Sequence, residues 1–248
     1  MGRRKKVRIC AAVVLFLLIA VAAVWFFQYN AVGYRMTVPY RSAFCEISDN
    51  IYINTEYLGD KEELIGLIES AKERVKDFFG DLRCLDKTVI IICDDDRLLT
   101  KLGGDHDTMS TIFPIEKLYI SVSDEYLSID ILAHELTHAE LHTRLSVSAQ
   151  KKLPTWFDEG IALQNDYREQ YAFEAWVVQT DNGRHTIALE DMNEASEFYA
   201  GTLEDRRFRY LNAKHEVSGW METNKRQGLL ELIDKLNHGE DFLIAFNR

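Results

Sequence analysis

An unbroken run of 19 apolar residues, Ile9–Phe27, constrains this chain more than any other feature of its sequence. A backbone can cross hydrocarbon only if its polar groups are bonded internally, and a run of this length spans the hydrocarbon core as one helix. Trp25 and Tyr29 stand at its far end, where interfacial aromatic residues are frequent. We therefore expect a transmembrane signal-anchor helix over residues 9–29.

The charges around this run predict its direction in the membrane. Residues 1–8 carry five of the 29 Lys and Arg side chains, and the first acidic residue is Glu46. The positive-inside rule keeps this basic segment in the cytoplasm and makes the rest of the chain extracytoplasmic. The alternative is a secreted protein whose signal peptide is cleaved after the small-residue pattern at 20–22. The continuation of the apolar run through Phe27 favours the uncleaved anchor.

The rest of the chain is acidic. Beyond the basic segment, 24 Lys and Arg side chains stand against 40 Asp and Glu, a formal charge of −16. Binding to a phosphate backbone depends on cationic side chains, so we do not expect a nucleic-acid partner. Four cysteines are too few for a disulfide scaffold, and none lies in a Cys-x-x-Cys motif. We expect Cys45, Cys84 and Cys93 to be small buried side chains with at most one disulfide among them.

Two segments follow the membrane helix. Residues 30–48 show no period and contain Gly33 and Pro39, which predicts a juxtamembrane linker. Residues 49–248 have the length and composition of one globular domain. Its oligomeric state is left open.

Hydrophobic periodicity predicts strands in the first part of this domain and helices in the second. Gly80 is expected to end the first helix, and Ser123 or Asp124 to begin the second. The expected strands are 50–55, whose alternation is typical of a half-buried strand, 89–93, whose continuous apolar run is typical of a buried one, and 109–113 and 118–122, which a short hairpin through 114–116 would join. The three acidic residues at 94–96 are expected to form a solvated turn and the N-terminus of a helix. The expected helices are 61–79, 125–145, 155–165, 168–180, 206–224, 227–237 and 240–246. This order predicts an α+β fold, with a small mixed sheet packed on the second helix and an all-helical C-terminal subdomain.

The second helix carries the sequence His-Glu-Leu-Thr-His at 134–138. Residues four apart lie on one face of a helix, so the imidazoles of His134 and His138 can reach one metal ion. Glu135 stands beside the first histidine and can act on water without binding the metal. A helix with two surface histidines and a glutamate in an ion pair is the alternative interpretation.

A catalytic zinc site needs a third protein ligand and an open position. His142 lies a further turn along the helix, too far for one ion to reach all three imidazoles. We expect it to be a solvated residue at the helix end. The metzincin pattern is excluded because Leu141 and Arg144 stand where that class has Gly and His. Glu159 is the remaining candidate, because a short loop and a return helix could bring its carboxylate back to the histidines.

The His-Glu-Leu-Thr-His motif, followed by Leu-Pro-Thr-Trp-Phe-Asp-Glu-Gly-Ile-Ala at 153–162, resembles the gluzincin metallopeptidases. More narrowly, it is similar to the small peptidase-MA-like group, in which a Pro-x-Trp-x-x-Glu-Gly segment supplies a glutamate ligand. The resemblance implies a thermolysin-like zincin core and covers about 200 residues, loosely outside the two motifs. It makes His134, His138 and Glu159 the zinc ligands and Glu135 the general base and acid.

The resemblance also implies an oxyanion-stabilising tyrosine on a downstream helix. Tyr210 is the expected residue, with His215 and Tyr199 as alternatives. One departure concerns the partner that orients a zinc-bound histidine, because Leu163 stands where thermolysin-type enzymes have an Asp. Asp158, Asp130, Asp166 or a backbone carbonyl could take that role instead.

The expected function is therefore that of a membrane-anchored, extracytoplasmic zinc metallopeptidase. It would hydrolyse peptide bonds of a peptide or protein substrate with zinc-activated water and Glu135. The alternative is a zinc-binding envelope module that has lost catalysis and serves in interactions. The sequence does not indicate the substrate or the cleavage preference.

Overall fold

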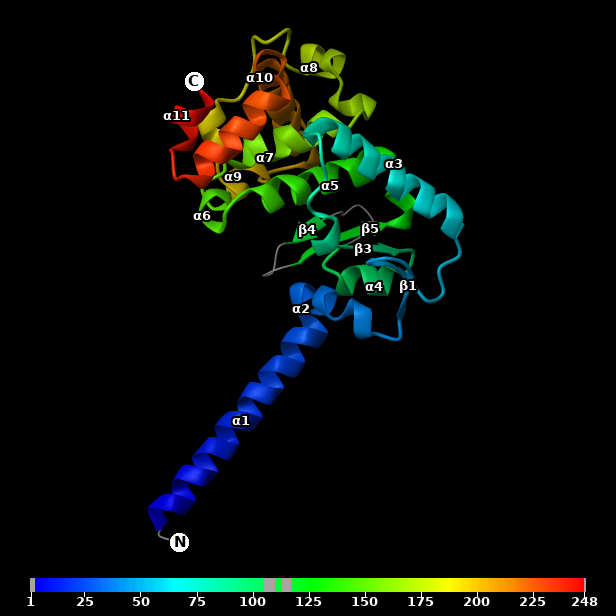
Figure 1. The fold of residues 1–248 in the computed structure, drawn as a ribbon, viewed down its shortest axis with the longest axis vertical. Coiled ribbons are helices and arrows are strands. Elements are labelled where there is room, and N and C mark those ends of the chain that lie inside the picture. Colours follow the sequence, from blue (N-terminus) through cyan, green and yellow to red (C-terminus); the bar gives the residue numbers. More distant parts are fainter. Residues whose placement is uncertain (1–2, 105–109, 113–116, 248) are drawn as a thin grey trace. The chain divides into compact units, whose positions relative to one another are not determined.

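The computed structural model describes residues 3–104, 110–112 and 117–247 (Figure 1). It is a mixed α+β structure with a small sheet, an N-terminal apolar helix and a largely helical C-terminal part. The chain divides into two compact units. Unit 1 comprises Met1–Leu58 and Val89–Tyr126, and unit 2 comprises Gly59–Thr88 and Leu127–Arg248.

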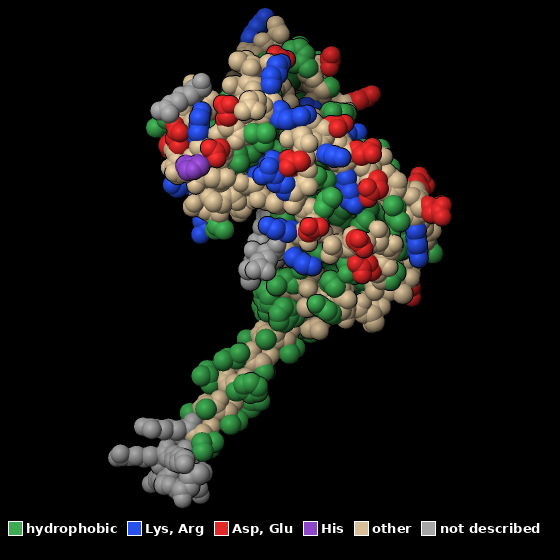
Figure 2. All heavy atoms as spheres, viewed as in Figure 1, with side chains coloured by type: hydrophobic (Ala, Val, Ile, Leu, Met, Phe, Trp, Pro, Cys, Tyr) green, Lys and Arg blue, Asp and Glu red, His purple; other side chains and the backbone are tan. Residues whose placement is uncertain are grey.

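Unit 1 begins with the long helix α1, Arg3–Tyr29. Its stretch Ile9–Tyr29 is long and apolar enough to cross a membrane. Hydrophobic side chains line the part of this helix that Figure 2 colours by type, and most of them are exposed. A helix that is apolar around its circumference has no polar face to turn to water, which is typical of a lipid-facing segment.

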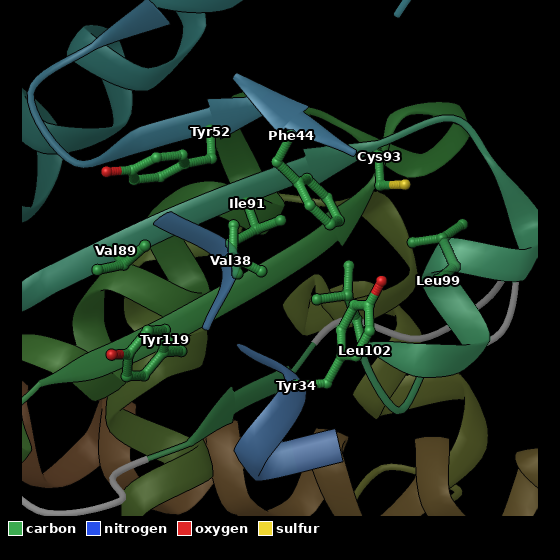
Figure 3. Packing of buried hydrophobic residues seen from close by; sticks show 10 residues of the cluster. All are labelled: Tyr34, Val38, Phe44, Tyr52, Val89, Ile91, Cys93, Leu99, Leu102 and Tyr119. Carbon is green, nitrogen blue, oxygen red and sulfur yellow. The ribbon is translucent and has the colours of Figure 1, made fainter. Parts of the chain in front are cut away.

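The expected linker is wrong for most of residues 30–48. This segment forms helix α2 (Ala31–Met36), a 3₁₀ turn (Val38–Tyr40) and strand β1 (Phe44–Ser48). Its apolar side chains enter the core at irregular intervals, so no helical or strand period shows in the sequence. Figure 3 shows three of them, Tyr34, Val38 and Phe44, packed with Ile91 and other buried residues.

The sheet of unit 1, as described, has five strands in the order β1-β2-β3-β5-β4. The strands after β1 are β2 (Ile51–Asn54), β3 (Thr88–Cys93), β4 (Ser110–Ile112) and β5 (Leu118–Ser123). Strand β2 runs parallel to β3 and antiparallel to β1, and β4 runs antiparallel to β5, so the sheet is mixed as predicted. Met109 and Phe113, the ends of the expected strand 109–113, and the expected hairpin turn at 114–116 lie outside the described residues.

Burial in the sheet differs from the prediction at one strand. The alternation at 50–55 predicted a half-buried strand, but all four residues of β2 are buried. Strand β3 is buried along its whole length, as its continuous apolar run predicted. Asp95 then caps helix α4 (Asp96–Lys101) and accepts hydrogen bonds from two of its backbone N–H groups, so the acidic triplet begins a helix as expected.

Unit 2 is built on two packed helices, α3 (Lys61–Phe79) and α5 (Ile129–Arg144). Gly80 ends α3 in the left-handed conformation, as predicted, with φ of 91°. Helix α5 begins later than expected, because Ser128 caps it. Ser123 instead ends β5, and Asp124 begins a 3₁₀ turn, Asp124–Tyr126.

The remainder of unit 2 is helical. Its helices are α6 (Val147–Gln150), α7 (Thr155–Ala162), α8 (Phe173–Gln179), α9 (Ala195–Phe198), α10 (Leu203–Asn237) and α11 (Phe242–Phe246). Short 3₁₀ turns lie at Leu85–Lys87, Leu163–Asn165, Glu169–Tyr171 and Leu189–Met192. The two helices predicted over 206–237 form α10, which is interrupted at Lys225, where φ is 57°. All four cysteines are free thiols, so the structure contains none of the disulfides that the cysteine count allowed.

Candidate metal centre

Helix α5 places two imidazoles on one face. His134 and His138 are four residues apart, and their Nε2 atoms lie 3.2 Å from each other. Both residues are buried to about 8% exposure, although an imidazole is costly to bury without a polar partner. The fully buried side chains of Leu132, Leu136 and Ala139 hold the helix in the interior. The alternative of two surface histidines therefore does not fit this structure.

Helix α7 brings Glu159 to the same place. Trp156 and Phe157 are fully buried in an aromatic cluster of unit 2, and the indole N–H of Trp156 donates to Asn193 at 3.2 Å. Gly160 has a packing reason: a Cβ there would collide with the backbone oxygen of Ala213 and the side chain of Val217. The Trp-x-x-Glu-Gly pattern thus anchors α7 on one side and allows α10 to approach closely beside the glutamate.

The three candidate ligand atoms form a nearly equilateral triangle. The Oε2 atom of Glu159 lies 3.3 Å from Nε2 of His134 and 3.4 Å from Nε2 of His138, and the third side is the 3.2 Å between the imidazoles. Ligand atoms of a tetrahedral zinc ion, with bonds of about 2.0–2.1 Å, are about 3.3–3.4 Å apart. The triangle therefore has the dimensions of one face of such a tetrahedron, and this group could bind a metal ion.

The hydrogen bonding of Glu159 fits the same interpretation. Its Oε1 accepts a hydrogen bond from the hydroxyl of Tyr199. Its Oε2 is buried and has no hydrogen-bond partner among the residues that the structure describes. A buried carboxylate oxygen without a partner is costly, and a cation between it and the two imidazoles would remove that cost.

Asp158 supports His138 from behind. Its Oδ1 lies 2.7 Å from Nδ1 of His138, which leaves Nε2 of that ring facing Glu159. Its Oδ2 lies 2.7 Å from Nε2 of His142. Metal-binding histidines usually donate their second ring N–H to a carboxylate or carbonyl in this way. Of the partners that the sequence left open, Asp158 lies within hydrogen-bond distance of His138 and is placed to take this role.

The two other candidate aspartates, Asp166 and Asp130, do not form a hydrogen bond to either histidine of the pair in the contacts described for them. Asp166 is fully buried, and its Oδ2 lies 3.7 Å from Nδ1 of His134, beyond hydrogen-bond distance. Asp130 instead accepts from Arg74 at 2.6 Å. His142 contradicts the sequence prediction, because its side chain is only 12% exposed and is bonded to Asp158.

Opposite charges in this buried place shift several pKa values. Burial favours the neutral form of His138, but the charges of Asp158 and Glu159 outweigh it and raise the pKa of His138 well above its usual value. Burial would raise the pKa of Glu159, but the neighbouring imidazoles outweigh it and lower that pKa to about 2. The pKa of Asp158 is lowered in the same way, against burial, by His138 and His142.

Glu135 and Tyr210 are the other expected residues of the centre. Glu135 lies on α5 beside His134 and is buried to 6% exposure. Tyr210 lies on α10, with its ring against those of Tyr171 and Phe198. Burial raises the pKa of Tyr210, and the charges of Glu159 and Glu135 raise it further, so the phenol keeps its proton.

The two alternatives to Tyr210 have other contacts. The hydroxyl of Tyr199 is bonded to Glu159, and burial followed by the charge of Glu159 raises its pKa strongly. The ring of His215 is stacked on those of Trp176 and Phe173. The sequence named Tyr199 only as an oxyanion candidate, because no local pattern links it to a carboxylate 40 residues away.

No known protein-family model matches this sequence, and a search of curated proteins gives no match.

Proposed function

We propose that this chain is a membrane-anchored zinc metallopeptidase of the gluzincin type, with its catalytic part outside the cytoplasm. The observation that carries the proposal is the triangle of Nε2, Nε2 and Oε2 atoms, 3.2–3.4 Å on a side, with Glu135 beside its first member. Two imidazoles and one carboxylate are the three protein ligands of thermolysin-like zinc sites. A closed structural zinc site would use a fourth protein ligand instead.

In this proposal His134, His138 and Glu159 hold the ion. Zinc bound there would supply Lewis acidity, which polarises a carbonyl group and makes water more acidic. Asp158 keeps Nδ1 of His138 protonated and directs Nε2 toward the ion. Tyr199 keeps the carboxylate of Glu159 turned so that Oε2 faces the two imidazoles.

The chain's own residues carry the proton transfers. The carboxylate of Glu135 takes a proton from the attacking water and then delivers it to the amide nitrogen as that nitrogen leaves. The protonated hydroxyl of Tyr210 donates a hydrogen bond to the oxyanion that develops on the carbonyl carbon. The products are a free carboxylate and a free amine, with one water consumed.

The test compares wild-type protein with Glu135→Gln on an unstructured substrate such as casein, with zinc measured in the same samples. We expect the variant to keep zinc and to lose about 10²–10⁴-fold in turnover, because it keeps the ligands but lacks the base. Turnover of the variant at the wild-type rate would contradict the mechanism. Zinc binding without turnover in the wild type would instead favour the inactive zinc-binding module.

A further inference from the structure

Asp158 is shared by two imidazoles that lie on successive turns of α5. Its two carboxylate oxygens lie 2.7 Å from Nδ1 of His138 and 2.7 Å from Nε2 of His142. Each oxygen therefore accepts one hydrogen bond from a ring that α5 holds in place. A carboxylate held at both oxygens cannot rotate without breaking one of these bonds.

The three side chains are enclosed together. The side chains of His138 and His142 are 10% and 12% exposed, and that of Asp158 is 22% exposed. The two histidines are four residues apart and so lie on the same face of α5. Asp158 directly precedes Glu159 on α7. The bond to His142 thus fixes the residue of α7 that directly precedes the third candidate ligand.

We propose that His142 is a positioning residue of the metal centre. It fixes the carboxylate of Asp158, and Asp158 in turn fixes the ring and tautomer of His138, leaving Nε2 open toward the metal. This inference rests on the proposed metal site, and it gives the third histidine of the motif helix a role that its spacing alone does not reveal.

The test measures zinc dissociation constants in the full-length chain, in detergent or nanodiscs, by competition with a chelator. Removing an outer partner of a metal-bound histidine weakens affinity by about 10–100-fold, and we expect Asp158→Asn to fall in this range. We expect His142→Ala to weaken affinity by about tenfold, because Asp158 keeps one of its two bonds. His142→Gln, whose amide can replace the Nε2 donor, should recover most of the loss.

A double variant separates positioning from general packing. If His142 acts through Asp158, the double variant His142→Ala, Asp158→Asn will bind zinc as weakly as Asp158→Asn alone. His238→Ala, at a solvent-exposed site, is the matched control and should leave affinity unchanged. Losses that multiply in the double variant, or unchanged affinity in His142→Ala, would overturn the proposal. If the wild type bound no zinc, the metal site would fail, and this inference with it.

A second, independent inference concerns the end of the membrane helix. Asn30 follows α1 and caps α2, accepting from the backbone N–H of Val32 at 3.0 Å. Gly33 lies directly against Phe26, where a Cβ would collide with the backbone oxygen and ring of that residue. Arg41 reaches back to α1 and donates to the backbone oxygen of Phe27 and, at 3.2 Å, to the side chain of Gln28.

The same segment is fixed to the core of unit 1. The guanidinium of Arg41 lies over the ring of Tyr34, 3.6 Å from its centroid, and Tyr34 is 3% exposed within the cluster of Figure 3. Arg35 is 2% exposed and donates through Nε to the backbone oxygen of Leu102 at 2.5 Å. A continuous chain of contacts therefore links the last turn of α1, through Arg41 and Tyr34, to the buried residues of the sheet.

We infer that α1 is retained in the mature protein and that residues 26–41 form a fixed joint that seats unit 1 on the bilayer. Cleavage after Ala22 would leave Val24 and Trp25, each about 60% exposed, on a helical stub in water. In a bilayer these side chains face lipid. Tyr29 and Tyr40, 77% and 89% exposed, then stand near the headgroups, where amphipathic rings are favoured.

The retention is tested by intact mass and alkaline extraction of the membrane-expressed chain. We expect a mass that includes residues 1–22 and resistance to extraction. A mature mass that begins after residue 22 would overturn this inference.

The joint is tested by spin-label distances in nanodiscs, between Tyr29→Cys and Leu58→Cys, in a background without Cys10 and Cys45. We expect one narrow distance distribution, which Arg41→Ala broadens and the exposed control Arg97→Ala does not. A broad distribution in the parent chain would show a flexible tether and overturn the fixed joint.

Discussion

Helix α5 contributes to two buried polar clusters, and they differ in whether both oxygens of the buried carboxylate have hydrogen-bond partners. Near its C-terminal end, Glu140 accepts from the backbone N–H groups of Arg83 and Cys84 at 2.7 and 2.9 Å and from Nε of Arg144 at 2.6 Å. Arg144 also donates to the side chain and backbone of Asp81. Both oxygens of this fully buried carboxylate are thus bonded within the protein.

The cluster of His134, His138 and Glu159 is also buried, but it leaves Oε2 of Glu159 without a hydrogen-bond partner among the described residues. A natural fold pairs its buried polar groups, and unpaired ones need an explanation. The Glu140 cluster is complete without a ligand and so has a structural role. In the histidine cluster a bound cation would supply the missing partner, which is why we propose the metal centre there.

The largest effect is expected from a substitution that breaks the Glu140 cluster. Glu140→Ala leaves the guanidinium of Arg144 buried without its main partner, which should cost about 3–5 kcal/mol of unfolding free energy. Denaturant unfolding of the solubilised chain measures this. The control is Glu69→Ala, which removes an exposed ion pair with Lys72 and should cost less than about 1 kcal/mol. Equal losses in the two variants would contradict the contrast.

The next largest effect is expected from a substitution that removes one candidate ligand from the cluster of His134, His138 and Glu159. Structural zinc sites bind with about 10–16 kcal/mol over four ligands, so loss of one ligand should weaken zinc affinity by roughly 10²–10³-fold. We expect this of His134→Ala in a chelator competition assay, whereas Glu140→Ala, while folded, should keep wild-type affinity. A His134→Ala protein with unchanged affinity would show that this imidazole is not a ligand.

A smaller loss of zinc affinity is expected when the hydrogen bond from Tyr199 to Glu159 is removed. Tyr199→Phe removes the donor to Oε1 of Glu159 and lets the carboxylate turn, so zinc affinity should fall about tenfold, the lower end of the range for outer partners. Tyr40→Phe, at a solvent-exposed tyrosine, is the matched control. If both variants bound zinc equally well, the orienting role of Tyr199 would be wrong.

The pH dependence of the metal cluster sharpens the comparison further. Zinc must displace a proton from His138, whose pKa is raised, so zinc affinity should increase about tenfold per pH unit from about pH 6.5 up to that raised pKa. Titration calorimetry at several pH values measures this slope. A flat profile would mean that His138 binds no proton in the free protein.

Zinc affinity should increase with pH, but the stability of the metal-free protein should decrease as pH rises above about 6.5. The lowered pKa values of Asp158 and Glu159 stabilise the fold above about pH 4.5, and that contribution is lost as pH falls toward them. The raised pKa of His138 stabilises the fold below about pH 6.5, and that contribution is lost as pH rises through it. Metal-free protein should therefore be most stable between these limits, which thermal unfolding measures.

The sequence predicted what local geometry determines. The spacing of His134 and His138 puts both imidazoles on one helix face whatever the rest of the chain does, and the helix over 61–79 has a clear period and a glycine cap. The third candidate ligand lies on another helix, so the spacing could only leave Glu159 as the remaining candidate, and the resemblance gave it the role of a ligand. The structure also explains why a glycine, Gly160, follows Glu159: α10 approaches so closely there that a side chain would collide with it.

The parts that the sequence missed depend on contacts between distant residues. His142 looked solvated because its partner Asp158 lies 16 residues further on, across a loop. Residues 30–48 looked like a linker because Tyr34, Val38 and Phe44 are buried through short irregular elements. A periodicity argument detects regular helices and strands, but it has no signal for such segments.

The most direct test of the metal centre is the metal content of the purified full-length chain, measured by mass spectrometry after dialysis against metal-free buffer. We expect one zinc ion per chain in the wild type and none in the double variant His134→Ala, Glu159→Gln. Folded wild-type protein without stoichiometric zinc, or a double variant that retains it, would contradict the account.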